Sequence, residues 1–233
     1  MIKSRTKAKE AIKNGGVKVN GKQCVLPSFE VGDSDEVTVE ALNDKYVSRA
    51  GYKLEKALDE FEIDVSGMTA LDIGASSGGF TDCLLQRGAK KVYAIDVGSS
   101  QLDASLLNDG RVVSRENTNA KTLKKSDFDS EIDIIVMDVS FISQRKLYPN
   151  AADILSKGKI FVSLIKPQFE LGRQNIGKGG IVKDARLFQP LINEIAECAA
   201  GYGFKLIRTI ESPIKGGDGN TEFLALFIKE ADI

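Results

Sequence analysis

Strand-sized apolar runs alternate with helical stretches from Tyr46 onward, and this alternation limits the possible folds more than any other feature of the sequence. The runs are rich in Val, Ile and Leu and poor in charge, as buried parallel strands are. They predict seven strands, at 70–73, 92–95, 111–114, 132–137, 160–165, 205–210 and 222–228. Strands that alternate with helices indicate an α/β domain built on a doubly wound, mostly parallel sheet.

The connections between the strands predict how this sheet ends. We expect helices at 48–58, 79–87, 144–155 and 186–202, with Ser48 as the N-cap of the first. Residues 211–221 are too few for a helical crossover, so the last two strands should be antiparallel. The carboxyl ends of the parallel strands and the start of the last strand then meet at one edge, where α/β sheets bind ligands.

A glycine-rich turn follows the first strand and predicts a cofactor site. Glycines let a backbone approach a ligand closely, and Asp96, at the end of the next strand, is positioned to accept hydrogen bonds from ribose hydroxyls. Ser76 stands where an NAD-binding turn has its second glycine, so S-adenosylmethionine, whose amino cation suits Asp72, fits better than NAD. The turn residues expected at the site are Asp72, Gly74, Ser76, Gly78, Gly79, Phe80 and Thr81.

The chain of 233 residues contains no histidine, which removes the usual general base near neutral pH and the commonest metal ligand. Ser-His-Asp hydrolysis is excluded, and we expect no metal site. Cys24, Cys83 and Cys198 are scattered singly, which fits free thiols in a reducing compartment. We expect no secretory signal and no membrane span, since no apolar run approaches about 18 residues, and therefore a cytoplasmic protein.

Positive charge is concentrated at the N-terminus, although the whole chain has a formal net charge of −1. Residues 1–23 carry seven basic side chains and one acidic one, a balance of +6. We expect a basic helix at 4–13, capped by Ser4 or Thr6, and strands at 17–19 and 37–39 around an Asn20-Gly21 turn. A small α+β module of this kind suits RNA phosphates, although a charge run is often only a solvated face.

The segment SRTKAKEAIKNGGVKVNGKQCVLPSFEVGDSDEVTVE resembles the RNA-binding domain named after ribosomal protein S-four, without that domain's opening helix. The resemblance implies a partial module at 1–44, joined by a linker at 45–50 to a catalytic domain at 51–233. It also implies that the basic helix and the hairpin contact the RNA backbone. The residues concerned are Arg5, Lys7, Lys9, Lys13 and Lys18.

Four charged side chains are expected to converge at the carboxyl edge of the sheet. Asp138 and Lys166 end the fourth and fifth strands, Glu222 begins the last strand, and Lys53 lies on the helix before the first strand. The set resembles the Lys-Asp-Lys-Glu tetrad of FtsJ-like ribose 2′-O-methyltransferases. The words YVSRAGYKLEKAL, LDIGASSGGFTDCLLQRGA, MDVSFIS and LIKPQFE are similar to those of the TlyA, or hemolysin A, family.

This second resemblance implies a Rossmann-like class I methyltransferase domain that transfers a methyl group from S-adenosylmethionine to cytidine ribose in ribosomal RNA or ribosomal subunits. Asn117, Thr118 and Asp138 would then also lie at the cofactor. Methylation of a ribose hydroxyl needs alignment and the loss of one proton, but no metal. Lys166 is the expected base, because a nearby second ammonium favours the neutral form of a lysine. Asp138 would orient it and Glu222 would position Lys53 or the ribose, although the two lysines could exchange roles.

A glycine-rich basic loop, 167–184, follows Lys166 and is expected to close over the substrate as a flap. Arg173 and Lys178 of this loop, together with Arg49, are further candidate RNA contacts. A long surface loop without function is the alternative. Two other functions stay open: an NAD-dependent oxidoreductase, and a non-catalytic ribosome-binding protein with a hemolysin label. Membrane lysis has the least support, since no amphipathic membrane helix is expected.

The basic helix predicts a salt-dependent contribution to RNA binding. Replacing Lys7, Lys9 and Lys13 by Gln should lower the slope of log affinity against log salt by about 0.7 for each phosphate that the helix no longer neutralises. The slope is measured by titrating RNA at several salt concentrations. Affinity for S-adenosylhomocysteine serves as the control and should stay the same, whereas an unaltered slope would mean that this helix does not touch phosphate.

Overall fold

The computed structural model describes residues 8–9, 11–12, 16–39 and 45–231. The chain forms two compact units, Met1–Lys45 and Tyr46–Ile233, each of which is described by itself. The domain limits of 1–44 and 51–233 and the linker at 45–50 remain proposals.

The N-terminal unit contains a three-stranded antiparallel sheet in the order β2-β1-β3, formed by Lys22–Gln23, Val17–Val19 and Val37–Val39. Asn20 and Gly21 both have positive φ, 52° and 74°, as a tight hairpin turn requires. The predicted hairpin and closing strand are therefore present. Residues 8–9 and 11–12 are helical. The predicted caps, Ser4 and Thr6, and much of the basic helix lie outside the described residues.

The second unit contains a seven-stranded sheet in the order β6-β5-β4-β7-β8-β10-β9. Strand β10 is antiparallel to both of its neighbours and the remaining pairs are parallel, so the predicted mostly parallel sheet with one antiparallel strand is confirmed. In chain order the strands are β4 (Thr69–Ile73), β5 (Lys91–Ile95), β6 (Val112–Arg115), β7 (Ile134–Met137), β8 (Ile160–Ile165), β9 (Phe204–Glu211) and β10 (Phe223–Lys229).

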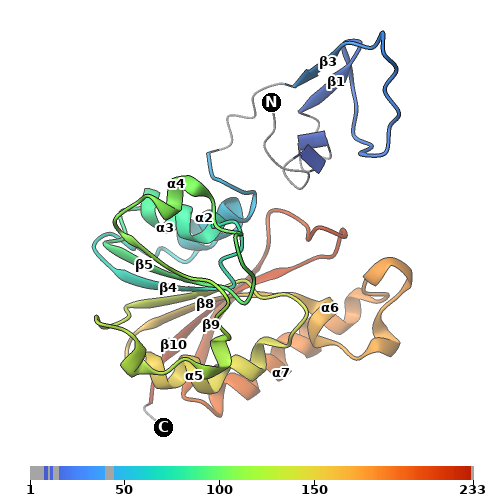
Figure 1. Cartoon of the computed structure of the whole chain (residues 1–233). Coiled ribbons are helices and arrows are strands. Elements are labelled where there is room, and N and C mark those ends of the chain that lie inside the picture. The colour runs from blue at the N-terminus through green and yellow to red at the C-terminus, as the bar shows by residue number, and fades with distance from the viewer. Residues whose placement is uncertain (1–7, 10, 13–15, 40–44, 232–233) are drawn as a thin grey trace. The chain divides into compact units, whose positions relative to one another are not determined.

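Helices cover both faces of this sheet (Figure 1). Alternate residues of β7 serve the two sides: Ile135 packs with the core under α5 and α7, and Val136 with the core under α2 and α3. This two-sided burial explains why the parallel strands are continuous apolar runs. The helices on one face are α2 (Ala50–Glu60), α3 (Gly79–Gln86) and α4 (Ala104–Leu107), and those on the other are α5 (Tyr148–Ile154) and α7 (Phe188–Ala200).

Several predicted helix boundaries are wrong, each for a local reason. The N-cap of α2 is Arg49 and makes no side-chain cap hydrogen bond, so Ser48 does not cap this helix. The predicted helix at 144–155 is a 3-10 turn, η3 (Gln144–Leu147), followed by α5, because Pro149 is tolerated only in the first turn of an α-helix. The helix predicted at 186–202 likewise begins in a 3-10 turn, η6 (Ala185–Leu187), and its α-helical part is α7, from Phe188 to Ala200. The short helix α4 was not predicted.

The packing of Tyr46 against α2 predicts the cost of adding a methyl group there. A Cβ at Gly51 would lie 2.3 Å from Cγ of the buried Tyr46, so Gly51→Ala should displace that ring. We expect the free energy of unfolding to fall by about 1–2 kcal/mol. The destabilisation by overpacking at Tyr46 should exceed the stabilisation that comes from the higher helix propensity of Ala. Chemical denaturation measures the change.

Gly110→Ala is the matched control, because nothing lies within 4 Å of a Cβ at that position. Its effect should stay within about 0.5 kcal/mol. Equal effects of the two substitutions would show that Tyr46 is not held against α2.

Candidate active site

The glycine turn between β4 and α3 has the backbone that its sequence predicts. Gly74 has a φ of +88°, and a Cβ there would lie 2.5 Å from the carbonyl oxygen of Asp138. Gly78, the N-cap of α3, has a φ of +95°, and its Cβ would collide with Leu106. Both positions therefore require glycine.

Asp96 fastens this turn to the end of β5. One carboxylate oxygen accepts a hydrogen bond from the backbone N–H of Ser76 at 2.7 Å, and the other accepts one from that of Gly98 at 2.7 Å. Each carboxylate oxygen can accept a second hydrogen bond, so Asp96 can still bind a ribose hydroxyl. The ribose contact remains a proposal.

A cavity of about 360 Å³ opens at the carboxyl edge of β4, β5 and β7. Five of the predicted cofactor residues line it: Gly74, Ser76, Asp96, Thr118 and Asp138. The structure also brings Gln101, Asn119 and Phe141 to its wall, and sequence reasoning missed these three. They lie on irregular segments after strands, where no periodicity marks the residues that face a ligand.

The other predicted cofactor residues lie outside the cavity lining. Gly78 is the N-cap of α3, and Gly79, Phe80 and Thr81 are buried residues of that helix. Asn117 has a φ of 54° and lies directly before Thr118, which lines the cavity. These residues lie next to the lining residues in the chain, and their direct contact with a cofactor remains a prediction.

Asp72 is a buried acid with one oxygen available. Its side chain is fully buried; Oδ2 accepts a hydrogen bond of 2.7 Å from the Thr81 hydroxyl, whereas Oδ1 has no hydrogen-bond partner among the described residues. Burial raises the pKa of Asp72 to about 7, and the charges of Asp138 and Asp96 act in the same direction. A cation would satisfy both the open oxygen and the charge, which fits the amino group of S-adenosylmethionine.

The four predicted catalytic residues form two ion pairs. Lys166 Nζ lies 2.5 Å from Asp138 Oδ1 and donates a 2.9 Å hydrogen bond to the hydroxyl of Ser140. Lys53 Nζ lies 2.6 Å from Glu222 Oε2. The Lys53 pair is deeply buried, with side-chain exposures of 7% and 2%. Breaking a buried pair leaves an uncompensated charge, so each carboxylate holds its lysine firmly.

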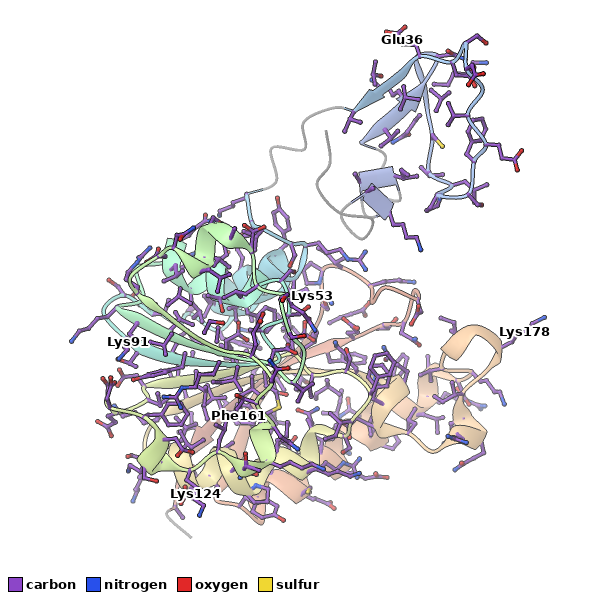
Figure 2. The ribbon with its side chains drawn as sticks, viewed as in Figure 1. Glu36, Lys53, Lys91, Lys124, Phe161 and Lys178 are labelled. Carbon is purple, nitrogen blue, oxygen red and sulfur yellow. The ribbon has the colours of Figure 1, made fainter. Side chains whose placement is uncertain are left out.

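The strand register explains why residues so far apart in sequence meet. Phe223 pairs with Ile165 in the antiparallel ladder of β10 and β8, so the next residues beyond that rung are Glu222 and Lys166. Asp138 follows β7, the parallel neighbour of β8. Lys53 comes from α2, which covers one face of the sheet, and Figure 2 shows it above the strands.

Phe141 is a site residue that no sequence pattern selects. Its side chain is 90% exposed, although its backbone has a φ of 63°, and its ring centroid lies 5.1 Å from that of Phe169. Left-handed backbone is unfavourable for a bulky residue and an exposed aromatic ring gains nothing from the core. Such a residue at a cavity wall offers a flat apolar surface to a ligand.

The predicted flap is a folded loop. It contains α6 (Pro167–Glu170), the 3-10 turns η4 (Arg173–Asn175) and η5 (Lys178–Gly180), and an antiparallel bridge between Ile176 and Val182. Asn220 ties it to the β9–β10 loop by accepting from Val182 N at 3.0 Å and donating to Gly180 O at 2.9 Å. Lys178 projects from its outer end (Figure 2).

The predicted RNA-binding residues are only partly described. Arg173, Lys178 and Lys9 are exposed, and Arg49 and Lys18 are half-buried. Arg5, Lys7 and Lys13 lie outside the described residues. Across the part of the chain that the structure describes, no helix is long and apolar enough to cross a membrane.

The sequence pattern of FtsJ-like methyltransferases matches residues 46–229, and that of the S4 domain matches residues 1–37. The chain therefore belongs to the FtsJ-like methyltransferase family. The predicted family and Rossmann-like fold are confirmed, and so is the predicted enzyme class, a methyltransferase that uses S-adenosylmethionine.

Within this family the chain is similar over nearly its whole length to proteins of the TlyA and hemolysin A group. It is 50% identical to hemolysin A of Brachyspira hyodysenteriae, over 97% of this chain and 94% of that protein. It is 39% identical to the 16S/23S rRNA (cytidine-2′-O)-methyltransferase TlyA of Mycobacterium tuberculosis, over 100% and 87%. A solved protein from Streptococcus thermophilus, described as a hemolysin, superposes with a TM-score of 0.83 at 41% identity, over 99% and 85%.

The raised pKa of Asp72 predicts that cofactor affinity depends on pH. A bound amino cation favours the carboxylate, so affinity for S-adenosylhomocysteine should rise as the pH increases from about 5.5 to about 7.5, with release of a proton. Titration calorimetry in buffers of different ionisation enthalpy measures both effects. Asp72→Asn should bind more weakly and show a nearly flat profile.

The same residue should have the opposite effect on stability. The pKa of Asp72 in the fold is about 7, above its ordinary value of 3.8, so the stabilising effect of the bound proton is lost as the pH rises toward 7. Asp72→Asn should therefore stabilise the ligand-free protein at neutral pH. A destabilised variant, or wild-type affinity that does not change with pH, would contradict the assignment.

Proposed function

We propose that this methyltransferase transfers the methyl group of S-adenosylmethionine to the 2′-hydroxyl of a cytidine in ribosomal RNA. The observation that carries this proposal is the Lys166–Asp138 ion pair, because Asp138 and Ser140 line the 360 Å³ cavity while Lys166 contacts both of them. A proton acceptor and a methyl donor would thus be adjacent.

Lys166 is the residue that we expect to take the ribose proton. S-adenosylmethionine supplies an electrophilic methyl group. A lysine acts as a base only as the neutral amine, which has two N–H bonds and one lone pair. Asp138 and Ser140 can accept the two N–H bonds of Lys166. The lone pair is then directed at the ribose hydroxyl, takes its proton as the oxygen bonds to the methyl group, and leaves Lys166 as an ammonium paired with Asp138.

The Lys53–Glu222 pair would hold a second ammonium beside the reacting groups. Glu222 neutralises this charge when the site is empty, and the ammonium can donate a hydrogen bond to the ribose when RNA is bound. Its deep burial keeps Lys53 in one position, which favours alignment over flexibility.

The names of two relatives support RNA as the substrate. TlyA of Mycobacterium tuberculosis is named for 16S and 23S rRNA cytidine 2′-O-methylation, and TlyA of Campylobacter jejuni, 35% identical over 97% of this chain, for 23S rRNA. An S4 domain at the N-terminus fits the same substrate. We therefore propose ribosomal subunits as partners and a cytoplasmic location.

Phe141 and the flap provide the features that an RNA substrate needs. Proteins that recognise unpaired nucleotides in RNA often stack an unstacked base on an aromatic side chain. The exposed ring of Phe141 has the right character for this stacking. Arg173 and Lys178 of the flap, and Arg49 before α2, would contact the phosphates on either side.

Removing the base should separate catalysis from cofactor binding. Lys166→Ala and Asp138→Ala should each lower the methylation rate by about a hundredfold or more, as loss of a general base or of its orienting group does. Affinity for S-adenosylhomocysteine should change little in Lys166→Ala, whereas Asp138→Ala can affect it because Asp138 lines the cavity. Single-turnover transfer of labelled methyl to ribosomal RNA measures the rate.

Lys157→Ala is the matched control, since this exposed lysine precedes β8 and Lys166 follows it. Its rate should equal that of the wild type. A synthetic RNA whose target 2′-hydroxyl is replaced by hydrogen should accept no methyl group. Continued transfer to the deoxy substrate would assign the methyl group to a base atom, and an unchanged rate in Lys166→Ala would remove the proposed base.

A further inference from the structure

Two loops at the carboxyl edge carry the reacting groups, and they are joined side by side. The first loop, 138–144, follows β7 and carries Asp138, Ser140 and Phe141. The second loop, 166–170, follows β8 and carries Lys166 and Phe169 on either side of Pro167. The contacts of Lys166 with Asp138 and Ser140 and the ring pair Phe141–Phe169 all run from one loop to the other.

Glu170 makes a further contact between these loops, and it does so away from the cavity lining. This residue ends α6, and its side chain is only 3% exposed. Oε2 accepts a 2.7 Å hydrogen bond from the Ser143 hydroxyl, and Oε1 accepts a 2.8 Å hydrogen bond from the backbone N–H of Gln144. We call these three residues the carboxylate latch.

The carboxylate latch lies where the 138–144 loop ends and the 3-10 turn η3 begins. Ser143 is the N-cap of η3, and its Oγ also accepts from Arg145 N at 3.3 Å. The donors therefore belong to a turn that is fixed to the core through the buried Leu147 and Tyr148. Because α6 begins directly after Lys166, the carboxylate connects that fixed turn to the base over only four residues.

The charge of Glu170 is compensated by groups at the end of the other loop and in the turn that follows it. Burial raises the pKa of Glu170, while the Ser143 and Gln144 hydrogen bonds and the charge of Arg145 act in the opposite direction. Arg145 Nε lies 3.6 Å from Glu170 Oε2, and its guanidinium also pairs with Glu194 of α7 at 3.2 Å. Arg145 thus has two carboxylate partners, of which only Glu170 touches the turn that follows Phe141.

We propose that Glu170 is a positioning residue for methyl transfer: its carboxylate holds the 138–144 loop against the 166–170 loop and so sets the alignment of Lys166 with Asp138 and of Phe141 with the substrate. The inference rests on the proposed role of Lys166 as the base. Reactions of this kind depend steeply on alignment, since a displacement of about 1 Å can cost about a hundredfold in rate.

Substitution of Glu170 should therefore lower the turnover rate more than binding. Glu170→Ala removes both acceptors and should reduce kcat on ribosomal RNA by about tenfold to a hundredfold, with affinity for S-adenosylhomocysteine changed by less than about threefold. Glu170→Gln keeps one acceptor oxygen for Gln144 N and should retain at least about a third of wild-type kcat. Rates are measured under single-turnover conditions at saturating cofactor.

Glu194→Ala is the matched control, because it removes the other carboxylate of Arg145 and leaves the latch intact. Its kcat should equal that of the wild type. An equal loss in Glu194→Ala and Glu170→Ala would assign the effect to Arg145 and overturn the proposal, as would an unchanged kcat in Glu170→Ala. If Glu170→Ala does not fold, Ser143→Ala tests the same contact, and full activity in that variant would overturn the proposal.

Two further measurements separate this inference from the proposed function. In a Lys166→Ala background, Glu170→Ala should lower kcat by a clearly smaller factor than in the wild type, since the part of its influence that passes through Lys166 is already lost; fully multiplicative losses would overturn the proposal. Hydrogen exchange requires no activity: the Gln144 amide should exchange at least about tenfold faster in Glu170→Ala than in Glu194→Ala. A wild-type protein that does not methylate RNA would refute the proposed function, whereas unchanged exchange at Gln144 would refute the latch.

Discussion

The antiparallel pairing of β10 with β8 determines which side chains meet in this enzyme. Parallel strands bring their carboxyl ends to one edge, and a reversed strand brings its beginning there. Glu222 can face Lys53 at the edge that carries Asp138 and Lys166 because Phe223 pairs with Ile165. Moving this register by one residue would turn every β10 side chain to the other face of the sheet, and the second ion pair would be lost.

The edge is also an electrostatic arrangement that works without histidine. Asp72, Asp96, Asp138 and Glu222 all lie there, and two of these acids are paired with lysines. Asp72 has no such partner among the described residues, and its pKa of about 7 reflects the cost of a buried carboxylate among other acids. The fold therefore keeps one unfavourable group whose cost a bound cation relieves, a common property of binding sites.

The sequence predicts those residues of the candidate site that directly follow the end of a strand. Apolar runs mark β4, β5, β7 and β8, and each run ends at a residue of the site, so Gly74, Asp96, Asp138 and Lys166 could be selected without a structure. Phe141 and Asn220 could not, because their roles come from a strained backbone and from hydrogen bonds to a distant loop. Thr81 shows a different limit: the sequence predicts it at the cofactor, whereas its hydrogen bond to Asp72 could be found only from the structure.

The hydrogen bonds of Asn220 predict where the flap of this chain tolerates a change in length. Its side chain grips the backbone of the flap at Gly180 and Val182, and its own carbonyl accepts from Gly216, so three short segments must keep their spacing together. An inserted residue between Gly216 and Asn220 would displace Asn220 and with it Glu222, which lies two positions after Asn220 in the chain. The outer turn at Lys178–Gly179 has no such bond among the described residues, and insertions there would leave the grip unchanged. Natural length variation in the flap should therefore concentrate at its tip. Relatives with longer flaps should still have an amide side chain at the position of Asn220, where the flap is held to the β9–β10 loop.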